Sequence, residues 1–139
     1  MTDPYNLQRF IDAQKDVFET ACAELSAGHK QSHWMWFIFP QLKGLGRSPT
    51  AQFYGISGRQ EAQAYLRHPV LGQRLRHSTQ LLLAVQGRSI RDILGSPDDL
   101  KFRSSMTLFS RVTEDNQVFL DALSKYYAGN SDERTLEIL

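Results

Sequence analysis

The chain has 139 residues and a formal net charge of +1, with 41% hydrophobic and 22% charged residues. These values are typical of one globular domain and exclude both a disordered chain and a fibrous repeat. Because 16 basic residues oppose 15 acidic ones, the chain has no overall field that would attract nucleic acid or an anionic membrane, and we expect neither as a partner.

Helix boundaries are marked by prolines that follow residues able to cap a helix. Proline is best tolerated in the first helical turn, and a preceding Ser or Asp accepts hydrogen bonds from the free amides there. Between these signals, apolar residues recur every three or four positions, as on a buried helical stripe. The pattern predicts helices that begin at Asp3-Pro4, Ser48-Pro49, Ser57, His68-Pro69, Ser89, Ser96-Pro97, near Val118 and at Ser131 or Asp132, with ends at Gly28, Gly87, Gly95 and Gly129.

The segment from His33 to Phe39 is ambiguous, because its aromatic and branched residues suit a strand while its place between helices suits a buried helix. A lone strand would leave its backbone groups without a ladder partner, which favours the helix. The sequence thus predicts an all-α fold, a single compact multi-helix domain over residues 1–139 with short connecting loops. We expect its core to contain Leu7, Phe10, Phe18, Leu25, Leu71, Leu75, Leu82, Phe109, Phe119 and Leu123.

The segment from Lys30 to Ser48 holds both tryptophans and is the first candidate for a site. On a helix, His33 would share a face with Trp36 and Phe37, and this aromatic wall would stack a flat ligand. The alternative is a core histidine that packs beside core aromatic residues. The sequence leaves both interpretations open.

Two glycines, Gly44 and Gly46, allow tight turning just before the helix predicted at Ser48. The free amides and the dipole of a helix start attract phosphate or carboxylate, and Arg47 stands beside this one. The longer glycine spacings of the Walker and dinucleotide-binding motifs are absent. The same residues also fit a plain loop followed by a helix cap, which requires no ligand.

The stretch from Asp98 to Thr107 gathers acids, bases and hydroxyls in about three helical turns. On a helix, Asp98, Lys101 and Ser105 would share one face and offer a carboxylate, a cation and a hydroxyl to one pocket. The plainer alternative is an acidic first turn, favoured by the helix dipole, followed by ion pairs on a solvated surface.

Several catalytic and metal-binding patterns are absent. The chain has no nucleophile elbow and no zinc-protease motif, and its four histidines include no pair at helical spacing, so we expect no metal ion and no cofactor. Cys22 is the only cysteine and fits a core thiol in a reducing compartment. Neither a secretory signal nor an apolar run near the ~20 residues of a membrane span is present, so we expect a cytoplasmic protein.

Four motifs carry a resemblance to a known family. They are His33-Trp-Met-Trp-Phe-Ile-Phe-Pro-Gln41, Gly44-Leu-Gly-Arg-Ser48, His68-Pro-Val-Leu-Gly72, and Gly95-Ser-Pro-Asp-Asp-Leu-Lys101 with the following Ser104-Ser-Met-Thr-Leu-Phe109. From about Leu7 to Leu139 the chain resembles domain-of-unknown-function family 1810, a set of small all-helical proteins. This resemblance implies a helical fold and no established activity. Some members carry the label calpastatin, although no calpastatin-type repeat is present here.

A shorter likeness lies in Phe10-x-x-Ala-Gln14, in Ser96-Pro-Asp and at Lys101-Phe102. It is similar to short stretches of the helical NADAR proteins, which are linked to ADP-ribose chemistry. The likeness is too short to assign residues to roles.

Two functions are compatible with these features. In the first, the protein is an enzyme or sensor that binds a small nucleotide-like or ADP-ribose-like anion, with hydrolysis of an N-glycosidic bond as an extension. The candidate catalytic residues are Asp98, Asp99 and His33, and the candidate ligand-binding residues are Lys30, Trp36, Gln41, Arg47, Ser48, Lys101, Ser104 and Ser105. In the second, a non-enzymatic module docks a partner or forms a homodimer through the aromatic residues 33–39. The sequence does not predict the oligomeric state.

Overall fold

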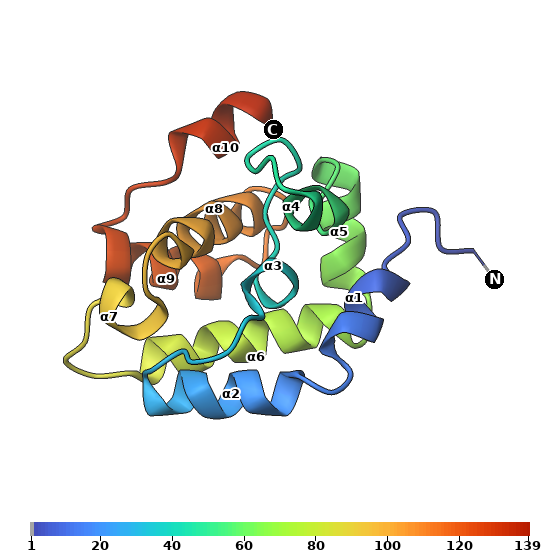
Figure 1. Ribbon diagram of the computed structural model, residues 1–139. Coiled ribbons are helices and arrows are strands. Elements are labelled where there is room, and N and C mark those ends of the chain that lie inside the picture. Colours follow the sequence, from blue (N-terminus) through green and yellow to red (C-terminus); the bar gives the residue numbers. More distant parts are fainter. Residues whose placement is uncertain (1) are drawn as a thin grey trace.

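The computed structural model describes residues 2–139, and within this range the chain forms ten helices and one isolated β-bridge (Figure 1). The helices are α1 (Gln8–Gln14), α2 (Phe18–Ala27), α3 (Met35–Ile38), α4 (Pro49–Phe53), α5 (Arg59–Arg67), α6 (Leu71–Ala84), α7 (Ile90–Leu94), α8 (Asp98–Ser110), α9 (Gln117–Tyr127) and α10 (Glu133–Ile138). The all-α prediction is confirmed. Among these described residues, no helix has both the length and the apolar character needed to cross a lipid bilayer.

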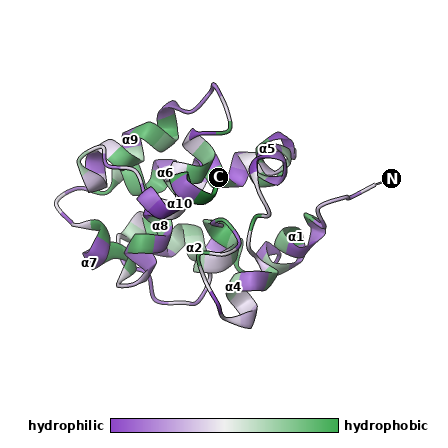
Figure 2. Cartoon of the chain, turned by 90° about the horizontal axis from the view of Figure 1, so that it is seen from above, coloured by the Kyte–Doolittle hydropathy of each residue, from purple (hydrophilic) through white to green (hydrophobic). Residues whose placement is uncertain are grey.

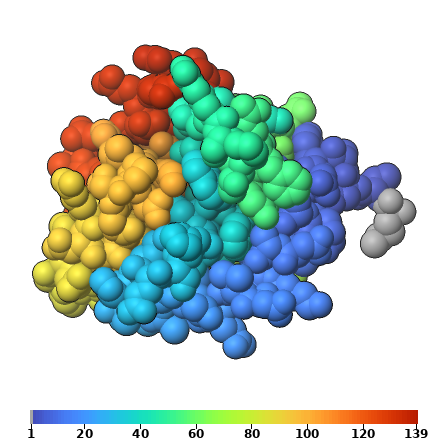
Figure 3. Space-filling model, viewed as in Figure 1, coloured from blue at the N-terminus to red at the C-terminus, as the bar shows by residue number. Residues whose placement is uncertain are grey.

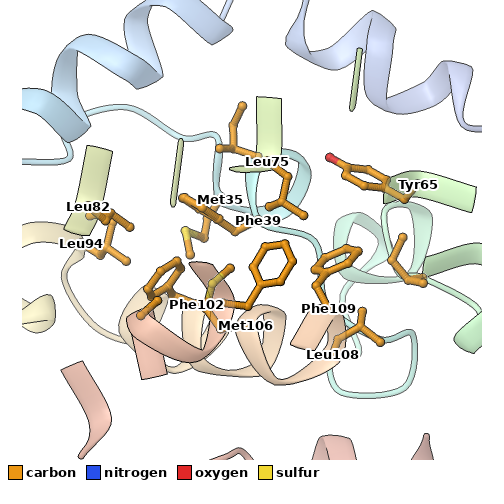
Figure 4. Packing of buried hydrophobic residues seen from close by; sticks show 14 of the residues in the cluster. Met35, Phe39, Tyr65, Leu75, Leu82, Leu94, Phe102, Met106, Leu108 and Phe109 are labelled. Atoms are coloured by element: carbon orange, nitrogen blue, oxygen red, sulfur yellow. The ribbon is translucent and has the colours of Figure 1, made fainter. Parts of the chain in front are cut away.

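The short helix α3 lies near the centre of the fold, among longer helices (Figure 1). α2 runs beside α6, α6 packs against α5 and α9, and α8 packs against α9. Apolar side chains from these helices share one interior, where the rings of Phe39 and Phe102 meet edge to face with 4.9 Å between centroids (Figure 4). The longer helices carry both hydrophilic and hydrophobic residues, as expected for helices with one buried stripe (Figure 2).

The predicted core is buried with one exception. The buried members are Leu7, Phe10, Leu25, Leu71, Leu75, Leu82, Phe109, Phe119 and Leu123. Phe18 is half-buried at the start of α2. The guanidinium carbon of Arg74 lies 4.7 Å from the centroid of its ring. The interior also contains Trp34 and Phe39, so the aromatic segment belongs to the core as well as to the surface.

The predicted first helix, from Pro4 to Gly28, is in fact two helices. α1 packs against α3 whereas α2 packs against α6, so the chain changes direction between them. The buried Gln14 fixes the end of α1, because its side-chain amide donates to the carbonyl oxygen of Phe37 at 2.7 Å. The predicted end at Gly28 is confirmed, and this residue has a left-handed φ of 71°, which glycine adopts without strain.

Side-chain caps confirm several predicted helix starts. Ser48 and Ser89 cap α4 and α7, each by accepting a hydrogen bond from an amide in the first turn. The start at Ser96-Pro97 is displaced by one residue. Pro97 occupies the cap position, α8 begins at Asp98, and the cap position provides no side-chain hydrogen bond.

The ambiguous aromatic segment contains the short helix α3, so the helical interpretation is confirmed for its centre. The chain then follows an extended path, and the amide of Ile56 donates to the carbonyl oxygen of Gln41 at 2.9 Å. The amide of Lys43 donates in turn to the carbonyl oxygen of Ile56 at 2.8 Å, and these two hydrogen bonds form the isolated bridge. Together with the contact of Tyr54 and Phe37, whose ring centroids are 5.3 Å apart, this bridge holds the end of α4 beside α3.

Candidate functional site

A hollow of about 300 Å³ lies where the chain after α2, the helices α3 and α4, and the first turn of α8 meet. It is lined by Lys30, His33, Trp34, Met35, Trp36, Phe37, Thr50, Asp98 and Lys101. In Figure 3, the cyan surface of the residues that follow α2 lies between the blue surface of α2 and the yellow and orange surface of α7 and α8. The hollow therefore joins segments that are far apart in the sequence.

Three charged side chains meet in this hollow and share one carboxylate. Lys30 Nζ lies 3.0 Å from Asp98 Oδ2, and Lys101 Nζ lies 2.9 Å from Asp98 Oδ1. The exposed fraction of the side chain is 8% for Lys30, 18% for Asp98 and 20% for Lys101. Burial by itself would raise the pKa of Asp98, but the hydrogen bonds and charges of Lys101 and Lys30 outweigh it and lower this pKa. Asp98 therefore stays ionised, and the cluster carries one excess positive charge.

Two tryptophans form the wall beside these charges. Lys101 Nζ lies 4.0 Å from the ring centroid of Trp36, and Lys30 Nζ lies 5.1 Å from that of Trp34, both within the range of a cation–π interaction. Trp34 is buried, whereas Trp36 and Phe37 are half-buried. A flat ligand would therefore meet Trp36 and Phe37 rather than Trp34.

Glu24, in the last turn of α2, fixes the segment that carries this wall. Its Oε1 accepts hydrogen bonds from the amides of Gln31 and Ser32 at 2.8 and 2.9 Å and from Trp34 Nε1 at 2.9 Å, while Ser32 Oγ donates to Oε2. Burial would raise the pKa of Glu24, but these donors lower it to about 2. Sequence reasoning missed this residue. The available signal was an acid in a last helical turn, where the helix dipole disfavours it unless other groups compensate.

The position of Lys30 follows from the way α2 ends. Gly28 turns the chain away from the helix axis, and the amide of Lys30 then donates to the carbonyl oxygen of Ile93 in α7 at 2.7 Å. Because α8 begins shortly after α7, this backbone bond brings Lys30 beside the first turn of α8. Asp98 stands at that turn.

Five of the predicted site residues line the hollow together: Lys30, His33, Trp36, Asp98 and Lys101. Six others are not among its lining residues: Gln41, Arg47, Ser48, Asp99, Ser104 and Ser105. His33 is exposed, so the alternative of a core histidine is wrong. Thr50, which sequence reasoning missed, lines the hollow from α4.

Local contacts explain why several predicted residues lie outside the hollow. The Oγ of Ser48 is occupied as the cap of α4, and the Oγ of Ser104 donates to the carbonyl oxygen of Leu100 at 3.1 Å. Ser105 is fully buried, and Arg47 is exposed on the loop before α4. α4 has only five residues, so its capped start has few free amides for an anion.

Asp99 and Gln41 contribute to the fold. The hydroxyl of Tyr127 donates to the backbone carbonyl of Asp99 at 2.5 Å. Burial, with the nearby negative charge of Asp99, raises the pKa of Tyr127. Gln41 is buried and provides a carbonyl of the isolated bridge. A ligand contact by any of the residues outside the hollow stays a prediction.

The described part of the chain, residues 2–139, contains no group of three His, Cys, Asp or Glu side chains placed to hold a metal ion. Cys22 is half-buried, and burial raises the pKa of its thiol. A thiol with a raised pKa is a poor nucleophile.

A family model described as "Protein of unknown function (DUF1810)" matches residues 4–139, which is nearly the whole chain. The chain belongs to this family. It is also similar to the conserved hypothetical protein Rv1873 from Mycobacterium tuberculosis, whose crystal structure has 57% sequence identity and a TM-score of 0.98 to this chain. That match covers 99% of this chain and 98% of the other. No curated protein matches this chain.

Membership of the DUF1810 family confirms the resemblance carried by the four sequence motifs, and the similarity to Rv1873 agrees with the all-α fold. The DUF1810 family is described as one of unknown function. This description assigns no ligand and no reaction to the residues of the hollow.

Proposed function

We propose that this protein binds a small anionic ligand with a flat aromatic part, of the nucleotide-like or ADP-ribose-like kind. The observation that supports this function best is that two lysine ammonium groups share one carboxylate in a hollow with an aromatic wall. At about 300 Å³, the hollow is at the small end of the range of ligand-binding pockets. It suits a ligand no larger than a nucleotide, or the corresponding part of a larger molecule.

The two lysines have hydrogen-bond donors to spare. An ammonium group has three N–H donors. Within residues 2–139, Asp98 is the only charged or hydrogen-bonding partner of either ammonium group. The unused donors and the excess positive charge suit an anionic group placed against both lysines.

The half-buried Trp36 and Phe37 provide a surface for the flat part of the ligand. Lys101 lies over one face of the Trp36 indole, so an anion that draws Lys101 toward itself would also uncover that face. Stacking of a nucleobase on an aromatic side chain contributes about 1–3 kcal/mol. The charges and the wall therefore favour one ligand that has both an anionic group and an aromatic ring.

The charge of the hollow favours binding over hydrolysis of an N-glycosidic bond. Such a hydrolysis develops positive charge on the sugar ring, which a free carboxylate would stabilise. Both oxygens of Asp98 are already paired with lysines, at 2.9 and 3.0 Å. The lowered pKa of Asp98 also makes it a weak general base. Among the other lining residues, His33 is of the type that most often transfers protons.

The alternative function, a protein-interaction or homodimerisation module that uses residues 33–39, has less support. Trp34 and Phe39 are each 1% exposed and belong to the core, so they offer no surface to a partner. Trp36 and Phe37 border the hollow. The exposed aromatic side chain of Phe53, at 54%, does not belong to residues 33–39 and so gives no support to an interface formed by them.

A ligand panel measured by thermal shift tests the proposal. The purified protein is mixed with adenosine 5′-phosphate, with ADP-ribose and, as a neutral control, with adenosine. A ligand present at 100 times its dissociation constant stabilises the folded state by about 2.7 kcal/mol. We expect the two anions to raise the melting temperature more than adenosine does. No shift with either anion, up to the limit of solubility, would contradict the proposal.

A matched pair of lysine variants shows whether a shift comes from the hollow. Lys30→Met removes one of the two ammonium groups, whereas Lys15→Met removes an exposed lysine that does not line the hollow. We expect the first variant to lose most of the ligand-induced shift and the second to keep it. Equal shifts in the two variants would assign binding to another part of the surface.

A further inference from the structure

We infer that Asp98 determines the charge of the ligand: the hollow selects a flat molecule whose acidic group carries one negative charge, as a phosphodiester does, over a doubly charged phosphate monoester. This inference rests on the proposed function and narrows its ligand class. It makes Asp98 a specificity residue, because a charge that repels the wrong ligand discriminates as well as a contact that attracts the right one.

The charges of the hollow balance with a single ligand charge. Two ammonium groups and one carboxylate leave one excess positive charge. A ligand group with one negative charge makes the cluster neutral. Apart from Lys30 and Lys101, the lining residues include no lysine or arginine that could pair with the second charge of a phosphate monoester, and His33 is exposed.

The second charge would also lie close to Asp98. An oxyanion binds an ammonium group at about 2.8 Å, and each ammonium nitrogen lies within 3.0 Å of an Asp98 oxygen. The bound oxygens of the ligand are therefore within roughly 6 Å of the carboxylate. Because the side chain of Lys30 is only 8% exposed, salt screens the repulsion between these like charges only weakly.

Asp98 does not relieve this repulsion by taking up a proton. Burial raises its pKa, but the hydrogen bonds and charges of Lys101 and Lys30 lower it by more. The other acid near the wall, Glu24, accepts hydrogen bonds from the amides of residues 31 and 32 and from the Trp34 indole. Asp98 is thus a fixed negative charge where the ligand anion binds.

Two ligands of nearly the same shape and different charge test this inference. Adenosine 5′-sulfate carries one negative charge, whereas adenosine 5′-phosphate carries two at pH 8, because the second ionisation of a phosphate monoester has a pKa of about 6. This pH also keeps histidine side chains, as a class, uncharged. By isothermal titration calorimetry, we expect the sulfate to bind the wild-type protein about tenfold more tightly than the phosphate.

The variant Asp98→Asn removes the repulsion, while its amide oxygen still accepts a hydrogen bond from a lysine. We expect the ratio of the two dissociation constants to change by about tenfold or more in favour of the phosphate. Asp121→Asn is the matched control, since it removes an exposed carboxylate on α9 that bonds only to Gln117 within residues 2–139. This control should leave the ratio unchanged. Circular dichroism establishes that both variants are folded.

The outcomes distinguish a failure of the role of Asp98 from a failure of the binding function. If the wild-type protein binds the phosphate at least as tightly as the sulfate, or if Asp98→Asn leaves the ratio unchanged, the role of Asp98 is overturned and the binding function stands. If neither ligand binds and ADP-ribose does not bind either, both the binding function and the role of Asp98 fail. If Asp98→Asn does not fold, the ratio in the wild-type protein decides.

Discussion

The ion pair of Arg9 with Glu61 and the cluster of Lys30, Asp98 and Lys101 are both largely removed from solvent, yet they differ in how many hydrogen-bond donors they use. Every N–H group of the Arg9 guanidinium has an acceptor: the carbonyl oxygens of Tyr5, Asn6, Phe53 and Gly55, and the carboxylate of Glu61 at 2.7 Å. The second oxygen of Glu61 accepts from the amide of Ser57 at 2.9 Å. Each lysine of the other cluster, by contrast, pairs with Asp98 and has donors left over.

This difference separates a structural ion pair from a candidate binding site. A guanidinium with all of its donors in use has none for a ligand, and it connects α1 with α5, with the last residue of α4 and with the chain after α4. The lysines keep free donors and face a hollow. A second hollow, of about 380 Å³, borders Arg9, so a concave surface by itself does not identify the site.

The largest loss of stability is expected at the Arg9 pair. Arg9→Met leaves Glu61, whose side chain is 4% exposed, without its cation, and leaves four backbone carbonyls without this donor. Removal of one partner from a buried ion pair costs about 3–5 kcal/mol, so we expect a loss of this size in the free energy of unfolding. Urea denaturation followed by circular dichroism measures it.

Arg9→Lys is the matched variant, because it keeps the positive charge and loses the planar five-donor geometry. We expect it to be destabilised less than Arg9→Met, and still measurably. If both variants lose less than ~1 kcal/mol, the pair is not structural and the contrast between the two clusters is wrong.

An intermediate loss is expected at Glu24, which supports the wall of the hollow from behind. Glu24→Ala leaves the amides of Gln31 and Ser32 and the Trp34 indole without this acceptor. An unsatisfied buried donor costs about 1–3 kcal/mol, and of these donors the Ser32 amide and the Trp34 indole are partly buried. The same change releases the indole against which Lys30 lies, so ligand affinity should fall as well.

The contribution of Glu24 should depend on pH in a defined window. Its pKa is lowered from 4.5 to about 2 in the folded protein, so its ionised form favours folding. This stability is fully present above about pH 4.5 and is lost as the pH falls toward about 2. The difference in unfolding free energy between the wild-type protein and Glu24→Ala should therefore shrink over this range. Glu19→Ala removes an exposed acid of the same helix and is the matched control for the loss of a negative charge.

The fold was predictable because its signals are local. A serine cap, such as Ser48 or Ser89, satisfies amides in the next helical turn, and Gly28 ends α2 by its own left-handed conformation. Apolar stripes then specify which face of each helix is buried. The break between α1 and α2 escaped prediction, because it depends on two different packing partners, α3 and α6.

The site was predictable only in part, because its members meet through contacts that no local pattern encodes. Lys30 reaches Asp98 because its amide bonds to Ile93, and the wall is held by Glu24 from another helix. Residue types identified Trp36, Asp98 and Lys101 correctly as neighbours. The loop with Arg47 has the right chemistry for an anion, but the structure places it outside the hollow.

The smallest change in stability is expected at the lysine cluster, where the effect on binding should be large. In Lys101→Met, Asp98 keeps Lys30 as a partner, and the methionine stem still covers the Trp36 ring. Because Asp98 stays paired with Lys30, we expect the free energy of unfolding to fall by less than it does in Glu24→Ala. Titration with adenosine 5′-phosphate should show most of the affinity lost. If Lys101→Met is strongly destabilised and still binds the ligand, the lysine cluster is structural and is not the binding site.

The most direct test of the central claim, that the cluster with unused donors is the binding site, is a two-dimensional amide NMR titration of the wild-type protein with adenosine 5′-sulfate. We predict that the largest shift changes fall on the amides of Lys30, His33, Asp98 and Lys101 and on the indole N–H of Trp36. The amides of Arg9 and Glu61 should not move, because that pair has no donor free for a ligand. Shift changes concentrated around Arg9, or none at saturating ligand, would contradict the claim.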